Sequence, residues 1–242
     1  MDAAFLLPHQ ERLLRRIEAL ETPLVQVWGW PGSGKSALLA AFCERQGDGA
    51  RGLSLGELEA EGLRETVQAA RVARWFVALG DSRESLDEVA RWLHPGQHLV
   101  FASESRWPEG HLPVSVVAPQ ELLLSSGEVA TFWHLLTGEV PSPEAATALW
   151  MASDGWYQPL RLALEATGGS GLESADPERL LEIATIRSFL RHEVLDALGE
   201  VRLALLEELP YERPGTEERG QEGWRVLDTR GLFVEGEERD RL

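Results

Sequence analysis

The sequence contains little cysteine, little positive charge and no long apolar segment. Its single cysteine, Cys43, excludes an intrachain disulfide, and one cysteine with six scattered histidines gives no zinc-ligand set. No apolar run approaches the ~20 residues that a transmembrane helix requires. The first residues, MDAAFLLPHQERLLRRIEAL, lack a basic segment followed by a long apolar one, so we expect no signal peptide and a cytoplasmic protein.

Basic residues are outnumbered by acidic ones, 23 against 40, and the formal net charge is −17. A protein that binds duplex DNA tightly needs a surface rich in Lys and Arg, so we expect no direct tight DNA binding by this chain. Of the 23 basic residues, 22 are arginines, and the only lysine is Lys35. An ammonium group is a compact point charge on a flexible stem, which suits a loop that binds phosphate.

Lys35 belongs to the segment GWPGSGKS, residues 29–36, which matches G-x-x-x-x-G-K-[ST] in full. Before it, LVQVW (24–28) has the pattern of a short buried strand, and after it SALLAAFCERQ (36–46) has helical spacing. A strand, a glycine-rich loop and a helix in this order are the context that a phosphate-binding loop requires. A chance glycine-rich turn would need neither this context nor the only lysine of the chain.

The residue types of this loop predict distinct contacts with a nucleotide. Gly32 and Gly34 let the backbone curl so that successive N–H groups face one anion. The start of the following helix adds its dipole. Lys35 is expected to contact the β- and γ-phosphates, and Ser36 to bind Mg²⁺. The predicted nucleotide-binding residues of the loop are Gly29, Trp30, Pro31, Gly32, Ser33, Gly34, Lys35, Ser36 and Ala37.

The other apolar runs up to residue 118 indicate an α/β fold. Alternating strand and helix patterns predict a parallel sheet covered by helices on both faces. Further strands are expected at 52–55, 73–79, 98–103 and 114–118, with helices at 57–70 and 85–93.

C-terminal to residue 118 the pattern indicates mainly helices. Ser125 and Glu128 have capping-box spacing, and Ser142 followed by Pro143 predicts a second helix start. Asp176, followed by a proline, predicts the start of one long helix that includes RSFLRHEVLDALG. Trp133, Trp150 and Trp156 recur in this part, and most of them are expected to pack in its core.

Four segments together carry a resemblance to a known family: PHQERLLRRIEAL, the phosphate loop, LHPGQHLVFASESRWP and ASDGWYQPLRLALEA. From about Leu6 to its end, the chain resembles the nucleotide-binding module of STAND regulators, signal-transduction ATPases related to AAA+ and NB-ARC modules. The last two segments, followed by GLFV, select the large ATP-dependent LuxR-type transcriptional activators typified by the maltose-regulon activator. The phosphate loop alone is shared by very many nucleotide-binding proteins.

The resemblance implies a fold of three parts. Residues 1–118 would form a P-loop core with a five-stranded parallel sheet of order 5-1-4-3-2, and residues 119–171 a helical lid. Residues 172–242 would form a helix and a partial or complete winged-helix domain. Its partners would be an adenine nucleotide and either other domains of a longer regulator or a separate protein.

The resemblance also implies ATP or ADP with Mg²⁺, bound between core and lid. Pro159, in GWYQPL, is expected to contact the base, and Leu7 and His9 to cover the adenine from the other side. Guanine-specific loops carry Asn-Lys-x-Asp, which a chain whose only lysine is Lys35 does not have. We therefore expect a preference for adenine over guanine.

The catalytic positions of the family are matched only in part. In RWFVALGDSRES, Gly80 stands where the first of two acids is expected, which leaves Asp81 as the candidate catalytic acid and, with Ser36, as a metal ligand. In FASESRWP, Glu104 stands where the family has an arginine that senses the γ-phosphate, and Arg106 follows two residues later as the candidate replacement. The histidine that the winged-helix domain presents to ADP has no counterpart by position.

Three functions are compatible with these features. The first is a nucleotide switch with slow ATPase activity. The second is a scaffold or co-regulator that binds nucleotide without hydrolysing it, which Gly80 and Glu104 favour. The third, a small-molecule kinase, ranks far behind, because its lid would need to be rich in arginine and the lid here is apolar and acidic.

Overall fold

The computed structural model describes residues 7–54, 60–70, 72–79, 83–104, 106–107 and 113–195, which form two compact units. The first unit contains the chain up to Gly29 and then Ser33–Leu122. The second contains Trp30–Gly32 and the chain from Leu123 onward. Of the predicted helix and winged-helix part, residues 172–242, the residues from 196 onward lie outside the described residues, and the division into three parts stays a prediction.

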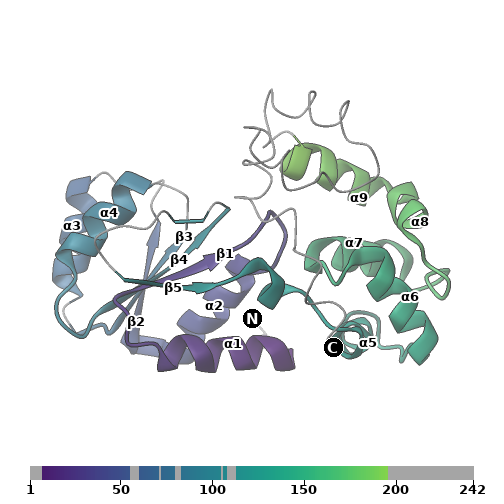
Figure 1. Ribbon diagram of the computed structural model, residues 1–242, viewed down its shortest axis with the longest axis horizontal. Coiled ribbons are helices and arrows are strands. Elements are labelled where there is room, and N and C mark those ends of the chain that lie inside the picture. Colours follow the sequence, from purple (N-terminus) through teal and green to yellow (C-terminus); the bar gives the residue numbers. More distant parts are fainter. Residues whose placement is uncertain are drawn as a thin grey trace, which may run out of the picture. The chain divides into compact units, whose positions relative to one another are not determined.

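The first unit contains a five-stranded sheet in which every paired strand is parallel to its neighbour (Figure 1), which confirms the predicted α/β class with a parallel sheet. The order of the strands is β2-β3-β4-β1-β5, or 5-1-4-3-2 when counted from the other edge. The strands are β1 Leu24–Trp28, β2 Ala50–Ser54, β3 Trp75–Leu79, β4 His98–Ser103 and β5 Val114–Val117.

Helices cover both faces of this sheet (Figure 1). One face packs against α1 and α2, and the opposite face against α3 and α4. This layering follows from the alternation of strands and helices along the chain, since parallel strands need crossover connections. The elements are α1 Pro8–Ala19, α2 Lys35–Gln46, α3 Ala60–Ala69 and α4 Arg83–Trp92, with short 3-10 turns at Gly47–Gly49 and Pro119–Leu122.

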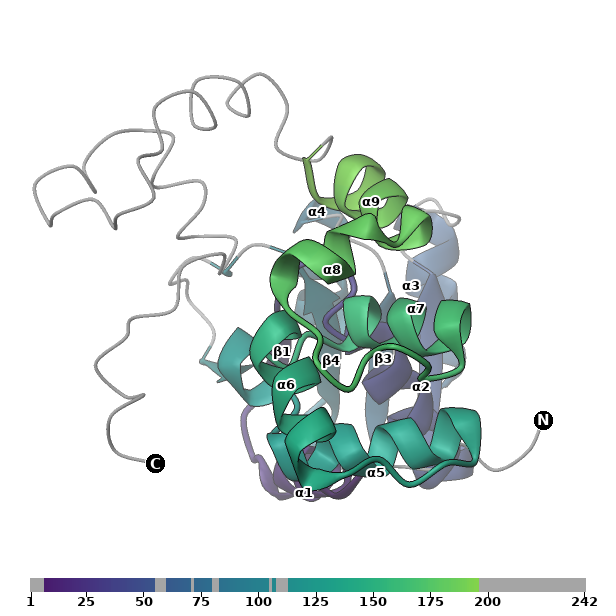
Figure 2. The same ribbon diagram turned by 90° about the vertical axis from the view of Figure 1, so that its right-hand side faces the viewer.

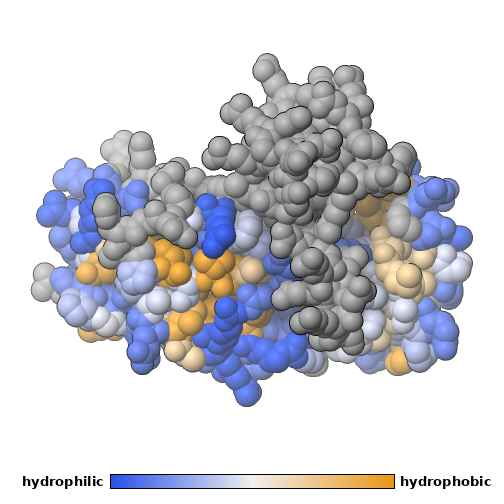
Figure 3. Space-filling model, viewed as in Figure 1, coloured by the Kyte–Doolittle hydropathy of each residue, from blue (hydrophilic) through white to orange (hydrophobic). Residues whose placement is uncertain are grey.

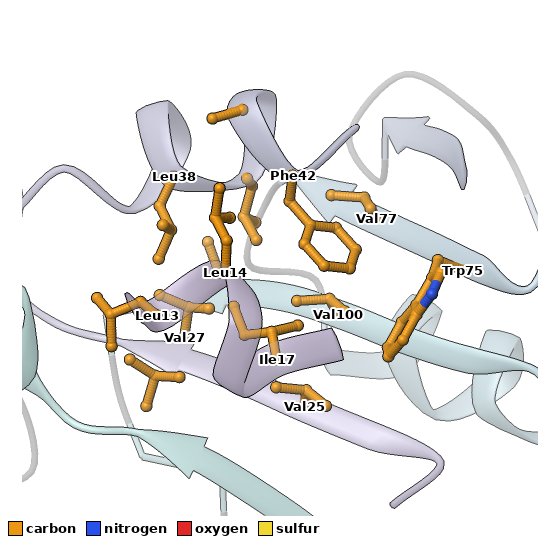
Figure 4. Close-up of a cluster of buried hydrophobic side chains, with 14 of the residues drawn as sticks. Leu13, Leu14, Ile17, Val25, Val27, Leu38, Phe42, Trp75, Val77 and Val100 are labelled. Atoms are coloured by element: carbon orange, nitrogen blue, oxygen red, sulfur yellow. The ribbon is translucent and has the colours of Figure 1, made fainter. Parts of the chain in front are cut away.

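The core on the α1 and α2 side is built from mainly aliphatic side chains, with the rings of Phe42 and Trp75, over the inner strands of the sheet (Figure 4). Leu14 and Ile17 from α1 and Phe42 from α2 are fully buried over Val25 and Val27 of β1. Burial of one such side chain stabilises a fold by about 1.5–3 kcal/mol. Because β1 lies between β4 and β5, this packing holds the strand that leads into the glycine-rich loop.

The edge strand β5 is only partly buried along its first three residues. Figure 3 shows a group of apolar residues on the surface over the middle of the first unit, where Figure 1 places β5. Arg16 of α1 donates a hydrogen bond to the Val116 carbonyl (3.1 Å) and forms an ion pair with Glu121. A charged side chain on an exposed strand edge opposes edge-to-edge association with other chains.

The second unit is helical among its described residues (Figure 2). The predicted capping box is confirmed, because Glu128 Oε2 accepts from the Ser125 N–H (3.0 Å). The predicted cap at Ser142 is confirmed as well, because its Oγ accepts from the Ala145 N–H (3.1 Å). The helices are α5 Ser126–Thr137, α6 Pro143–Ser153, α7 Tyr157–Thr167, α8 Pro177–Glu182 and α9 Ala184–Phe189, followed by a π-helical segment, Leu190–Leu195.

The prediction of one long helix after Asp176 is wrong. The helix ends at Ile183, whose backbone is extended (φ −72°, ψ 115°), and α9 begins at the next residue. The break frees backbone carbonyls at the end of α8, and the Arg187 guanidinium donates to two of them, Leu181 O and Glu182 O, both at 3.0 Å. This side-chain cap compensates for the lost helical hydrogen bonds.

A close backbone contact joins the start of this unit to the turn before α7. The Leu124 N–H donates to the Gly155 carbonyl (2.9 Å), and the Leu124 carbonyl accepts from the Trp150 indole N–H (2.9 Å). Gly155 has φ +73°, and a Cβ at this position would lie 2.2 Å from the Leu124 carbonyl oxygen. Only glycine combines this backbone conformation with this approach.

The sheet contains a buried polar side chain, that of Gln26. Gln26, in β1, is fully buried; its Nε2 donates to Ser103 Oγ (2.6 Å) and its Oε1 accepts from the Trp107 N–H (3.0 Å). The apolar pattern of residues 24–28 gave no indication of this role. The side chain connects β1 to the end of β4 and to the segment that follows it.

We predict that Gly155→Ala destabilises the protein more than Gly168→Ala does. Both glycines have positive φ, but a Cβ at Gly168 would meet nothing within 4 Å. The left-handed conformation costs alanine about 1–2 kcal/mol at either site, and the clash with Leu124 adds about 1–3 kcal/mol at Gly155. Urea denaturation followed by tryptophan fluorescence measures both losses; equal losses would contradict the contact.

We predict that Gln26→Leu lowers the free energy of unfolding by about 1–3 kcal/mol, because it removes the hydrogen bonds that Gln26 makes with Ser103 and Trp107 while roughly preserving volume. Gln120→Leu, at an exposed position, is the control and should change stability by less than about 0.5 kcal/mol. Denaturant titration of both variants is the measurement. If Gln26→Leu behaved like the control, the buried network would contribute nothing to stability.

Candidate functional site

The segment GWPGSGKS connects the inner strand β1 to the helix that follows it. Strand β1 ends at Trp28 and α2 begins at Lys35, so the motif has the strand–loop–helix context that the sequence predicts. The Gly29 N–H donates to the Ser103 carbonyl at the end of β4 (3.2 Å), which fixes the start of the loop on the sheet. Gly34, immediately before the helix, has φ +92°, and its carbonyl accepts the first helical hydrogen bond, from Leu38 (2.9 Å).

Lys35 is buried at the first position of α2, and its ammonium turns back into the loop. Its Nζ donates to the Gly29 carbonyl at 2.7 Å. Ser36 and Ala37, in the same first turn, are exposed. The start of the twelve-residue helix α2 therefore brings three features together: the Lys35 ammonium, the positive end of the helix dipole and the exposed Ser36 hydroxyl.

Ser33 has a buried hydroxyl in the loop. Its side chain is 3% exposed, and its Oγ has no hydrogen-bond partner among the described residues. A Cβ on Gly29 would approach this oxygen to 2.8 Å, so the two residues leave no room for a larger side chain at residue 29. A buried polar atom without a protein partner, next to a lysine and a helix N-terminus, fits a loop that accepts an anion.

The apex of the loop, Trp30–Gly32, belongs to the second unit. The Trp156 indole N–H donates to the Pro31 carbonyl (3.1 Å), and the Gln158 backbone N–H donates to the Gly32 carbonyl (3.0 Å). The Trp30 and Trp156 rings meet edge to face, with centroids 6.0 Å apart. The sequence pattern, which predicts core packing for most tryptophans of this part, gives no indication of these contacts of Trp156.

Phe189 completes the aromatic group around the apex. Its ring lies 5.6 Å from that of Trp156, and a Cβ on Gly32 would come within 2.6 Å of both Phe189 Cζ and Gln158 Cβ. With φ +72°, Gly32 is therefore required both for the turn and for this packing. No spacing in the sequence indicates Phe189, because the contact depends on the break between α8 and α9.

The predicted catalytic residues, Asp81 and Arg106, follow β3 and β4 in the sequence. Glu104 follows Ser103 directly and is half-buried, and its carbonyl accepts from the Trp28 indole N–H (3.3 Å). Arg106 is exposed. Gly80 and Asp81 lie outside the described residues, so the roles of Asp81 and Arg106 stay predictions.

The residues predicted to contact the base belong to different units. Leu7 and His9, at the start of α1, are buried in the first unit, where Gln10 Oε1 accepts from the Leu7 N–H (3.1 Å). Pro159 is buried in the second unit, one residue after Gln158. Their contact with a base remains a prediction.

The described residues show neither a metal site nor a reactive thiol. Among them, no three His, Cys, Asp or Glu side chains come together as a metal site. Burial raises the pKa of the Cys43 thiol, so it stays protonated at neutral pH and is a poor nucleophile. No helix in the described part of the chain is long and apolar enough to span a bilayer.

Comparison with known proteins gives similarity in structure only: no family model and no curated protein matches the chain. The Walker-type ATPase PABY2304 of Pyrococcus abyssi is 16% identical, with a TM-score of 0.51 over 95% of this chain and 90% of that one. The K64R mutant of Thermotoga maritima RuvB is 12% identical (TM-score 0.43; 91% and 81% covered). The FIGL-1 AAA domain in complex with ADP is 15% identical (TM-score 0.43; 86% and 89% covered).

At these identities the similarity concerns the fold alone, and the Walker-type ATPase is the comparison that carries it. Its match extends over nearly the full length of both chains. In this chain, a parallel five-stranded sheet holds a complete phosphate-loop motif after β1, an inner strand. The chain therefore has the fold of a P-loop ATPase.

Proposed function

We propose that the chain is the adenine-nucleotide-binding switch module of a STAND-type transcriptional regulator, with slow or impaired ATP hydrolysis. The observation that carries this proposal is the complete phosphate loop between β1 and α2, with the only lysine of the chain buried in it. ATP and ADP would stabilise different conformations of the module, and that difference would be the signal. The STAND assignment rests on the resemblance carried by the four segments together, and the adenine preference on the resemblance in GWYQPL.

The described residues supply the groups that a bound nucleotide needs. Backbone N–H groups of the loop would surround the β-phosphate, and Lys35 Nζ would exchange the Gly29 carbonyl for phosphate oxygens. The exposed Ser36 hydroxyl, at the start of α2, would bind Mg²⁺. The metal would neutralise phosphate charge when bound.

Slow hydrolysis follows from the charges at the end of β4. Phosphoryl transfer depends on cationic groups that stabilise the transferring phosphate. Here Glu104 directly follows Ser103, whose carbonyl binds the first N–H of the loop, and the nearest arginine in sequence, Arg106, is exposed. One lost electrostatic contact in such a site costs about 10²–10³ in rate. Asp81 would then act as the remaining acid and second metal ligand.

A second function is a hydrolysis-deficient scaffold or co-regulator that acts through protein–protein contacts. Glu104 favours it as well, because a carboxylate near the loop opposes turnover without preventing binding. Both functions place the chain in the cytoplasm, with other domains or a separate protein as partner and without direct tight DNA binding. Measurable ATP turnover supports the switch, and its absence in a protein that binds nucleotide supports the scaffold.

We predict that Lys35→Ala weakens ADP and ATP binding by roughly 10- to 150-fold, since a hydrogen bond to a charged group contributes about 1.5–3 kcal/mol. Arg64→Ala, which removes an exposed positive charge on α3, is the control and should leave affinity unchanged. Calorimetric titration in the presence of Mg²⁺ measures both. Unchanged affinity in Lys35→Ala would show that this loop is not the nucleotide site.

We predict that Glu104→Gln raises the affinity for ATP several-fold and the affinity for ADP less, because removing ~1 kcal/mol of repulsion changes affinity about fivefold. Glu44→Gln, at an exposed position near the end of α2, makes the same change in net charge and should have no such effect. The ratio of the ATP to the ADP dissociation constants is the measurement. An equal ratio in both variants would mean that the Glu104 carboxylate does not face the γ-phosphate.

A further inference from the structure

The Pro31 and Gly32 carbonyls, at the apex of the loop, both accept hydrogen bonds from the same element. Both donors, the Trp156 indole N–H and the Gln158 backbone N–H, come from the start of α7, at 3.1 Å and 3.0 Å. The peptide bonds of the described residues are trans. In a trans peptide the C=O and the N–H point in opposite directions, so the N–H groups of Gly32 and Ser33 point away from α7.

The contact between α7 and the loop satisfies a backbone hydrogen-bonding group on each side. The first N–H groups of a helix have no partner within it, and the Gln158 N–H belongs to the first turn of α7. Trp156, at the N-cap position, provides no side-chain cap. The Gly32 carbonyl therefore takes the place of a capping side chain, and the helix in turn fixes the orientation of the peptide between Gly32 and Ser33.

The indole of Trp156 is fixed on two sides by aromatic rings. Trp30 meets it at 6.0 Å with an interplanar angle of 82°, and Phe189 at 5.6 Å with an angle of 66°. Because these rings already fix the indole, its N–H can point at the Pro31 carbonyl with little further loss of side-chain entropy when the loop binds a ligand. Proline has no N–H of its own, so the first backbone N–H after Trp30 is that of Gly32, in the same peptide as the Pro31 carbonyl.

From these contacts we infer that Trp156 is a positioning residue for the phosphate loop: it holds the Pro31 carbonyl so that the Gly32 N–H is oriented for a diphosphate group. The inference rests on the proposed function. It assigns a specific role to an aromatic side chain that lies 125 residues from the loop in the sequence.

The test replaces Trp156 by phenylalanine, which keeps an aromatic ring but removes the indole N–H. Affinity for ADP and for inorganic pyrophosphate, both with Mg²⁺, is measured by calorimetry. Loss of one hydrogen bond that orients the donor predicts roughly two- to tenfold weaker binding of both ligands. Because pyrophosphate has no base, its weaker binding would locate the effect at the phosphates.

Trp150→Phe is the matched control, because the Trp150 indole N–H also donates to a backbone carbonyl of the second unit, Leu124 O, at 2.9 Å. We expect thermal unfolding to shift in both variants and pyrophosphate affinity to fall only in Trp156→Phe. Equal affinities in Trp156→Phe and wild type, or an equal fall in both variants, overturn the inference while the proposed function stands. A wild-type protein that binds neither ligand would contradict the proposed function itself.

Discussion

The hydrogen bond between the Gly29 N–H and the Ser103 carbonyl determines where the chain leaves the sheet at the end of β1. β1 is buried and pairs with both β4 and β5. At Gly29 the chain leaves this strand and continues as the loop that leads to α2. Lys35 returns to the same residue through its contact with the Gly29 carbonyl. Gln26 binds the hydroxyl of Ser103 from inside the sheet, so Ser103 is held through both its backbone and its side chain. The geometry of the loop thus depends on the register of β1 against β4.

The net negative charge of the chain makes the local positive charge at the loop important for binding an anion. In a chain with a net charge of −17, an anionic ligand is repelled by most of the surface, and binding requires a local concentration of positive potential. The start of α2 provides it through Lys35 and the helix dipole. Glu104 follows Ser103 directly in the sequence, and under the proposed function its negative charge makes binding without rapid turnover the expected behaviour.

The parts of the fold that were predictable from the sequence are those determined by neighbouring residues. The bounds of β1 and β4 were predicted as observed, because central parallel strands are short apolar runs bounded by turn residues. The caps at Ser125 and Ser142 involve partners three residues away, so their spacing is visible in the sequence. The edge strand β2 was predicted to start two residues late, because the exposed, charged Arg51 interrupts its apolar pattern.

Contacts between distant residues could not be predicted in this way. Gln26 and Ser103 are 77 residues apart, and Trp156 and Pro31 are 125 apart, so no local pattern relates them. The break at Ile183 depends on the Arg187 guanidinium folding back on the end of α8, which helical spacing does not indicate. The motif therefore located the phosphate loop, while the structure was needed to find the side chains that hold it.

The most direct test of nucleotide binding is to denature the purified protein and to identify any released small molecule by chromatography. A loop held in this geometry, with slow turnover, is predicted to carry ADP through purification in near-stoichiometric amount. A protein that releases no nucleotide, and that also shows no affinity for added ADP or ATP in the presence of Mg²⁺, would contradict the account.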